Sequence, residues 1–187
     1  MALLRSQMIA MIMMTDNDQH GSLMGDLATL VAATEGSASF KVEGMAEEEE
    51  NEAVLTILQV ALHAADVSNP AKPWRLYEAW TDMVIHEFFE QGDKERALGM
   101  DVSFAYDRLA PVPLPKLQQG FIKAIVLPLF QAFGQLPRVS LDHCLAHLQD
   151  NLDRWHRRQL ENESCGGSGA SPMSSPSASP PPSPSKR

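Results

Sequence analysis

The sequence is short of cysteine, of long apolar runs and of basic residues, and each shortage excludes a class of protein. Its two cysteines, Cys144 and Cys165, lie far apart and make neither a disulfide framework nor a metal-ligand spacing. Such cysteine use is typical of a reducing compartment, so we expect a cytoplasmic protein. The apolar run Met8–Met14 is too short to span a bilayer. It also lacks a small-x-small cleavage site before Asp16, which argues against a secretory signal.

Basic residues are outnumbered: 15 Lys and Arg stand against 24 Asp and Glu, and the formal net charge is −9. Proteins that bind nucleic acid gather Lys and Arg along one face, so nucleic acid is not an expected partner. A chain of 187 residues is long enough for one domain with a buried core, or for a part of a larger domain.

Strand-like alternation is missing as well, and apolar residues recur instead at the spacing of a helix face. The segments with a helical pattern are Met1–Met14, Ser22–Ala33, Val54–Ala65, Tyr77–Phe88, Lys116–Leu129 and Ser140–Leu160. The sequence therefore predicts an all-α fold. The first segment is apolar nearly all round, and a helix of that kind is normally buried in something larger.

Three stretches break the helical pattern. Residues 34–52 combine glycine and serine with the acidic run Glu47–Glu50, and we expect an acidic surface loop there. Gly99–Pro115 contains several prolines, which exclude a continuous helix. Residues 164–187 are nearly all Ser, Pro, Gly or Ala, so we expect a disordered tail after a folded domain at 1–163. Pro128 is expected to kink its helix or to end its first part.

Asp66 is the most informative single residue in the central stretch Leu62–Asp93. A mainly apolar helix leads up to it, and Asn69-Pro70 stops that helix because the residue before a proline is pushed out of the helical region. Asp66 is either a solvated residue at a helix end or a ligand directed into a cleft. Its charge opposes the helix dipole, and local rules fail most often at functional sites. Spacing alone leaves both interpretations open.

Two other polar sites also have two interpretations. Asp16, Asp18 and His20 alternate as metal ligands do, but a calcium loop needs further ligands and a closing Glu, so a capping turn is favoured. Gln118 lies one turn before Phe121, and its amide projects either from the apolar face or into solvent. Spacing alone favours solvent for Gln118.

The chain also carries a series of short motifs in a fixed order. They are Leu-His-Ala-Ala-Asp-Val-Ser-Asn-Pro at Leu62–Pro70, Trp80-Thr81, Glu-Phe-Phe-Glu-Gln-Gly-Asp at Glu87–Asp93, Asp107-Arg108, Gln-Gln-Gly-Phe-Ile at Gln118–Ile122, and Pro128–Phe130. Together they resemble the catalytic domain of class I cyclic-nucleotide phosphodiesterases. The turn at Met14–Asp16 is similar to the family's Ala-Thr-Asp-Met-Ser turn, and Leu148–Trp155 is similar to its closing helix. The resemblance spans about Leu3 to Trp155.

The resemblance implies an all-α catalytic domain that hydrolyses cAMP or cGMP to the 5′ monophosphate. It also implies two divalent metals, zinc and magnesium or manganese, which hold a hydroxide nucleophile and stabilise charge on the phosphate. Asp66 matches a metal-ligating carboxylate, Gln118 the amide that hydrogen-bonds the purine edge, and Phe121 the ring that stacks on the base. The other positions that match the base pocket are Asn69, Tyr77, Trp80, Thr81, Val84, Ile85 and Phe88.

Two parts of the family signature have no match in this chain: His-Asn-x-x-His, whose first His is the general acid, and a later His-Asp pair. None of the six histidines directly precedes an Asp. Because one carboxylate cannot hold a pair of metals, we expect the metal site to be incompletely liganded here. We expect no catalytic residue in this chain.

Two functions follow as alternatives. The chain is either the C-terminal, base-binding part of a phosphodiesterase catalytic domain or a catalytically inactive helical fragment that acts as a binding or regulatory module. The expected partners are cAMP or cGMP, together with either a second copy of the chain or the missing N-terminal half of the domain. Asn69 leans toward cAMP by similarity, but an amide can rotate to serve either purine, so the choice stays open.

Overall fold

The computed structural model describes residues 2–39 and 46–165, and every regular element in these ranges is helical. The elements are α1 (Ala2–Met13), the 3₁₀ turn η1 (Asn17–Gln19), α2 (His20–Thr34), α3 (Glu47–Asp66), the 3₁₀ turn η2 (Asn69–Ala71), α4 (Trp74–Ala97), α5 (Leu114–Phe121), the π-helical turn η3 (Ile122–Val126), α6 (Leu127–Phe133) and α7 (Asp142–Cys165). The predicted all-α class is confirmed. No helix in the described ranges is long and apolar enough to cross a membrane.

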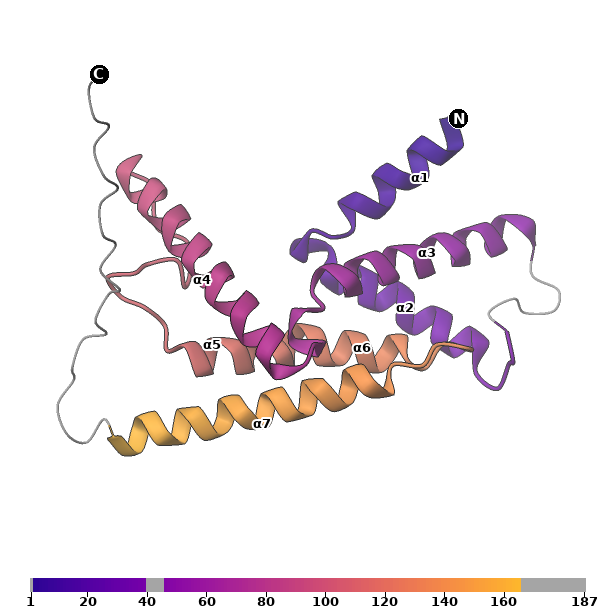
Figure 1. Ribbon diagram of the computed structural model, residues 1–187. Coiled ribbons are helices and arrows are strands. Elements are labelled where there is room, and N and C mark those ends of the chain that lie inside the picture. Colours follow the sequence, from indigo (N-terminus) through magenta and orange to yellow (C-terminus); the bar gives the residue numbers. More distant parts are fainter. Residues whose placement is uncertain (1, 40–45, 166–187) are drawn as a thin grey trace, which may run out of the picture.

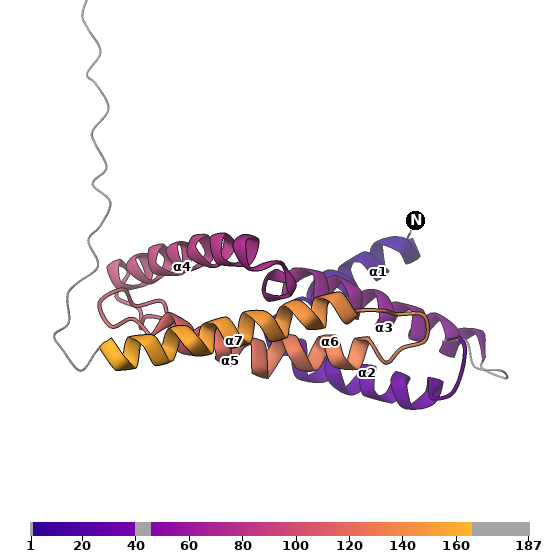
Figure 2. The same ribbon diagram turned by 60° about the horizontal axis from the view of Figure 1, so that its bottom comes forward.

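The helices form a packed body from which two of them extend. α5, η3 and α6 follow one another along α7, while α2 and α3 pack on each other and on α6 (Figure 1). α1 packs mainly on α3. Both views place α1 and α4 on the side away from α7, where they diverge from each other (Figure 2). At its base α4 contacts the turn η2 and α7.

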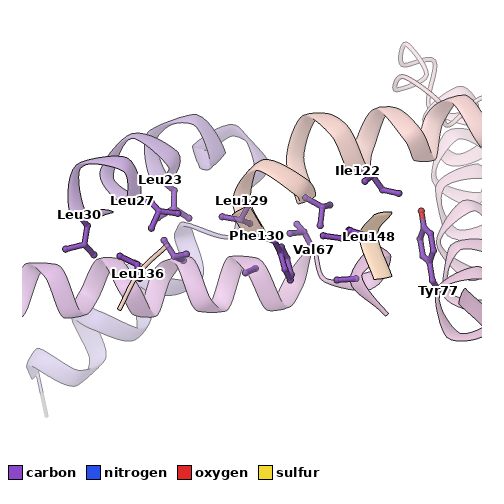
Figure 3. Packing of buried hydrophobic residues seen from close by; sticks show 14 of the residues in the cluster. Leu23, Leu27, Leu30, Val67, Tyr77, Ile122, Leu129, Phe130, Leu136 and Leu148 are labelled. Atoms are coloured by element: carbon purple, nitrogen blue, oxygen red, sulfur yellow. The ribbon is translucent and has the colours of Figure 1, made fainter. Parts of the chain in front are cut away.

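The core lies between α2, α3, α6 and α7. Leu23, Leu27 and Leu30 repeat at helical spacing and form the buried face of α2 (Figure 3). The same cluster includes Val60 and Ala64 of α3, Leu129 and Phe130 of α6, and Leu148 and Trp155 of α7. Each large side chain that is fully buried contributes roughly 1.5–3 kcal/mol, so this cluster holds the body together.

The acidic loop predicted at 34–52 is shorter than expected. α2 runs to Thr34 and α3 begins at Glu47, so the prediction is wrong for Thr34 and for residues 47–52, which are helical; residues 40–45 lie outside the described ranges. Glutamates are favoured in the first turn of a helix because the helix dipole is positive there. The carboxylate of Glu49 also accepts a hydrogen bond from the Ala46 N–H at 3.0 Å. The acidic run is therefore the start of the helix.

The structure confirms the helix break expected at Gly99–Pro115 and the disturbance expected at Pro128. α4 ends at Ala97 and α5 begins at Leu114, so the irregular segment expected near Gly99–Pro115 is present. Ahead of Pro128 the helix widens into η3, where the Leu127 N–H bonds the Ile122 carbonyl five residues back. A proline disturbs the backbone bonds of the preceding turn, and π turns are one response. Of the predicted tail at 164–187, Ser164 and Cys165 complete α7, and the rest lies outside the described residues.

Candidate functional site

A cavity of about 260 Å³ lies where the end of α3, the turn η2, α4 and α5 meet. Ten residues line it, and they are mainly apolar: Asp66, Val67, Asn69, Pro70, Thr81, Val84, Phe88, Leu117, Gln118 and Phe121. Pockets for drug-sized ligands are roughly 300–1,000 Å³. The cavity is therefore just below the small end of that range and suits a ligand portion the size of a ring system rather than a larger molecule.

Local sequence explains why these side chains converge. Asn69-Pro70 ends α3 and starts η2, which brings Asn69 next to the residues at the end of α3. On α4, Thr81, Val84 and Phe88 follow at three and then four residues, so they share one helix face. Gln118 and Phe121 share a face of α5 for the same reason. The cavity is thus built from three helix surfaces and one turn.

The amide of Gln118 is held by a hydrogen-bond relay of fixed polarity. Trp155 Nε1 donates to the Tyr77 hydroxyl oxygen at 3.0 Å, since an indole N–H can only donate. Tyr77 in turn donates its single proton to Gln118 Oε1 at 2.7 Å. Burial raises the pKa of the Tyr77 hydroxyl, so this proton stays in place. The relay fixes the amide oxygen toward Tyr77 and turns the NH₂ group away from it.

Tyr77 was expected to line the pocket, but it lies behind the cavity wall. Its side chain is completely buried, and its hydroxyl is directed toward the helical run that carries Ile122 (Figure 3). It is hydrogen-bonded to Gln118 on the side away from the cavity and is not among the residues that line the cavity. Tyr77 therefore acts on the cavity through the orientation of Gln118.

Asn69 brings a second polar group to the wall. Its Oδ1 atom is buried and has no hydrogen-bond partner in the part of the chain that the structure describes. A buried acceptor without a partner costs about 1–3 kcal/mol. The Asn69 side chain would recover that energy by turning Oδ1 toward a ligand donor in the cavity.

The segment between α4 and α5 fixes the outer wall. Phe88 stacks on Tyr106 with ring centroids 4.3 Å apart and planes tilted by 14°. Arg96 Nη2 lies 2.6 Å from Asp107 Oδ1, which ties the segment back to α4. The backbone N–H and the hydroxyl of Ser103 donate to Glu95 at 2.7 and 2.9 Å. Phe88 is thereby held in one orientation at the cavity.

Asp66 is exposed at the rim of the cavity, at the last residue of α3. Within residues 2–39 and 46–165, no three His, Cys, Asp or Glu side chains come together so that they could hold a metal ion. A catalytic metal pair needs several ligands with fixed geometry. The residues around Asp66 therefore do not fit such a pair by themselves.

Seven of the ten residues expected from the resemblance line the cavity: Asp66, Asn69, Thr81, Val84, Phe88, Gln118 and Phe121. The three others do not: Tyr77 lies behind Gln118, Trp80 is 52% exposed, and Ile85 is half-buried. Their role toward a nucleotide stays a prediction. Val67, Pro70 and Leu117 were missed as lining residues, although each lies within or beside a motif that was recognised.

A pair of histidines close to Asp66 was also missed. His20 Nδ1 and His63 Nε2 are 3.0 Å apart, and the His63 side chain is completely buried. Burial lowers the pKa of both histidines. A neutral pair is therefore favoured, with one ring donating and the other accepting. The contact ties the start of α2 to α3, one turn before Asp66.

The sequence is similar to a protein-family model and to curated proteins. The family model described as 3′5′-cyclic nucleotide phosphodiesterase matches residues 1–148. The "Probable 3′,5′-cyclic-AMP phosphodiesterase pde-4" of Caenorhabditis elegans is 35% identical over 162 residues, which cover 85% of this chain and 23% of that protein. The "3′,5′-cyclic-AMP phosphodiesterase 4C" of Mus musculus is 36% identical over 157 residues, which cover 84% of this chain and 22% of that protein.

A solved structure of LmjPDEB1 in complex with IBMX is similar in fold, with a TM-score of 0.70 and 22% sequence identity. The likeness covers 86% of this chain and 44% of that one. This chain thus spans less than half of the solved structure and 22–23% of the two curated relatives.

Proposed function

The chain belongs to the 3′,5′-cyclic nucleotide phosphodiesterase family, and we propose that its cavity binds the purine base of a cyclic nucleotide. In the complete enzyme, this binding would hold the cyclic phosphate for hydrolysis to the 5′ monophosphate, as part of cyclic-nucleotide signalling in the cytoplasm. Gln118 contacts the base edge, and Phe121 stacks on the ring. Asn69, Thr81, Val84 and Phe88 form the remaining wall.

The observation that carries this proposal is the relay from Trp155 through Tyr77 to Gln118. A purine edge presents a hydrogen-bond donor and an acceptor side by side, and a side-chain amide matches such a pair with two bonds. An amide that faces an apolar cavity of about 260 Å³ suits that task. The rings of Phe121 and Phe88 add stacking and apolar contact.

We infer further that the base is adenine, so that the substrate is cAMP. Adenine presents an amino donor where guanine presents a carbonyl acceptor. The unpaired Asn69 Oδ1 is an acceptor and suits the amino group once the side chain turns toward the cavity. An amide that Tyr77 holds in one orientation would also discriminate between the two edges. The two curated relatives described above are named as cyclic-AMP phosphodiesterases, which supports the same choice.

Asp66 stays a proposed ligand of a divalent metal, zinc or magnesium. Such a metal supplies Lewis-acid activation of water and phosphate in hydrolysis. Asp66 lies at the rim of the base cavity, which is where a phosphate attached to a bound nucleoside would emerge. The other ligands would have to come from residues outside the described ranges or from another chain.

Binding of the 5′ monophosphates tests the proposal without any need for turnover. The full chain is titrated with AMP and with GMP, and binding is followed by NMR chemical shifts and by calorimetry. We expect AMP to bind more tightly than GMP. Gln118→Ala should weaken AMP binding about tenfold, because one bidentate contact is worth roughly 1–3 kcal/mol.

Gln131→Ala serves as the matched control, since Gln131 is an exposed glutamine on α6 and does not line the cavity. It should leave AMP binding unchanged. An AMP affinity that Gln118→Ala leaves unchanged would contradict the base pocket. Equal affinity for AMP and GMP would contradict only the choice of adenine.

A further inference from the structure

Large apolar side chains are unusually exposed in this chain. Within the described residues, 15 large hydrophobic side chains are exposed, and the hydrophobic core also contains 15 residues. Eight of the exposed ones lie on the two helices that extend from the body: Leu4, Met8, Ile9, Ile12 and Met13 on α1, and Leu76, Trp80 and Met83 on α4. Contiguous exposed apolar surface of this kind marks an interaction site.

The apolar face of α1 has no cover within the described chain. Its five apolar residues are each 51–63% exposed. The opposite side of the helix packs on α3, where Gln59 Nε2 donates to the Ala10 carbonyl at 3.4 Å. α1 therefore already uses one side for its own fold and presents the other outward.

The apolar stripe on α4 adjoins the cavity. Leu76, Trp80 and Met83 follow at four and then three residues, so they share one helix face. That face lies next to the one that carries Thr81 and Val84 into the cavity. A partner seated on the stripe would reach the rim of the cavity.

The two surfaces are large enough for a stable complex. A large side chain that is half exposed presents on the order of 100 Å², so the eight together approach the roughly 800 Å² that one partner buries in a standard interface. Both helices extend on the side away from α7 and diverge there (Figures 1 and 2). A partner that contacts both helices would approach from that side.

We propose that the apolar faces of α1 and α4 are a docking surface for the part of a phosphodiesterase catalytic domain that this chain does not match, and that they bind this part when it is supplied as a separate polypeptide. The solved structure with the same fold superposes 86% of this chain on only 44% of its own length. More than half of that fold thus has no counterpart here. The identity of the partner rests on the proposed function, whereas the two binding faces do not.

Co-expression tests the interaction directly. The full chain is produced together with the tagged catalytic domain of the mouse relative from which the segment aligned with this chain has been deleted. We expect the two to copurify, and size-exclusion chromatography with light scattering to give the mass of a 1:1 complex. Ile12→Glu and Trp80→Glu should each lower the yield of complex at least tenfold.

Leu160→Glu is the matched control, because Leu160 is also half exposed but lies near the end of α7. It should leave the yield unchanged. Circular dichroism of each variant checks that the helices remain. The proposal is overturned if no complex forms, if Ile12→Glu and Trp80→Glu leave it intact, or if the chain forms a homodimer through these faces and excludes the fragment.

AMP binding by the complex separates this proposal from the base pocket. Gln118→Ala should weaken AMP binding about tenfold, as in the free chain, and leave the complex intact, since Gln118 lines the cavity and lies on neither apolar face. A complex that forms but does not bind AMP would overturn the proposed function and leave the docking surface standing.

Discussion

The side chain of Asn151 holds the backbone of Pro70, although 81 residues separate them in sequence. Asn151 Nδ2 donates to the Pro70 carbonyl at 2.7 Å and to the Lys72 carbonyl at 2.8 Å. The Asn151 side chain is completely buried. Through these two bonds α7 fixes the turn η2, and η2 carries Asn69 at the cavity wall.

Asn151→Ala is therefore expected to destabilise the chain and to weaken ligand binding in the cavity. Two backbone carbonyls would lose their partner, at about 1–3 kcal/mol for each one that stays buried. Urea unfolding should give a free energy of unfolding lower by about 2–4 kcal/mol, and AMP affinity should fall as Asn69 is released. Asn162→Ala, at an exposed asparagine of the same helix, should change neither quantity. Equal stability of the two variants would show that the Asn151 side chain does not hold the turn η2.

Tyr77→Phe should remove base discrimination with only a moderate loss of stability. The change deletes one hydroxyl, which leaves Trp155 Nε1 without its acceptor and lets the Gln118 amide rotate. We expect a loss of about 1–3 kcal/mol in unfolding free energy. The ratio of AMP to GMP affinity should fall toward one. Tyr106→Phe makes the same chemical change on the stacked ring of the loop, and it should preserve the ratio.

Helical periodicity predicted the elements well because it is a local property. Leu23, Leu27 and Leu30 follow the spacing of one face, and that face is the buried one. The run Glu47–Glu50 was misread because composition is the same for a solvated loop and for the first turn of a helix. The bond that distinguishes them, from the Ala46 N–H to Glu49, is a backbone contact that composition does not reveal.

The site was harder to predict because its decisive contacts join distant residues. For Gln118, local spacing favoured solvent. Gln118 is oriented by Tyr77, which precedes it by 41 residues. Tyr77 in turn accepts a hydrogen bond from Trp155, which follows Tyr77 by 78 residues. Family resemblance predicted base-pocket roles for Gln118 and Tyr77, which stay predictions, but only the fold reveals the hydrogen bond through which Tyr77 orients Gln118.

Gly92→Ala should disrupt the outer wall of the cavity, whereas Gly120→Ala should not. A Cβ atom at Gly92 would clash with the carbonyl group of Tyr106, which is backbone and cannot turn aside. The segment that stacks Tyr106 on Phe88 would have to move, at a cost of about 1–3 kcal/mol. At Gly120 nothing lies within 4 Å of such an atom. There alanine should stabilise α5 by about 0.5–1 kcal/mol.

Thermal unfolding of the two glycine variants checks this, because the expected shifts have opposite signs. The NMR shifts of the Phe88 ring should change only in Gly92→Ala. A melting temperature for Gly92→Ala at or above that of the parent chain would show that the segment near Tyr106 is not packed on α4 as described.

The pair His20 and His63 should make stability depend on pH. Burial lowers the pKa of His63, and the charge of Asp66 raises it to a smaller extent. Burial and then the neighbouring His63 lower the pKa of His20. In the unfolded chain both have an ordinary pKa of about 6.5. As the pH falls below that value, the unfolded chain takes up protons first, so stability is lost progressively through the folded pKa values.

His20→Asn isolates this contribution, because asparagine is polar but does not titrate. The free energy of unfolding is measured by urea denaturation between pH 7.5 and pH 5.5 for the parent chain and the variant. We expect the parent to be more stable at pH 7.5 and its advantage to shrink as the pH falls. His156→Gln, on an exposed part of α7, should follow the parent curve. An advantage that stays constant would mean that folding does not shift the pKa of His20, and one that grows toward pH 5.5 would mean that folding raises this pKa; either result would contradict the prediction.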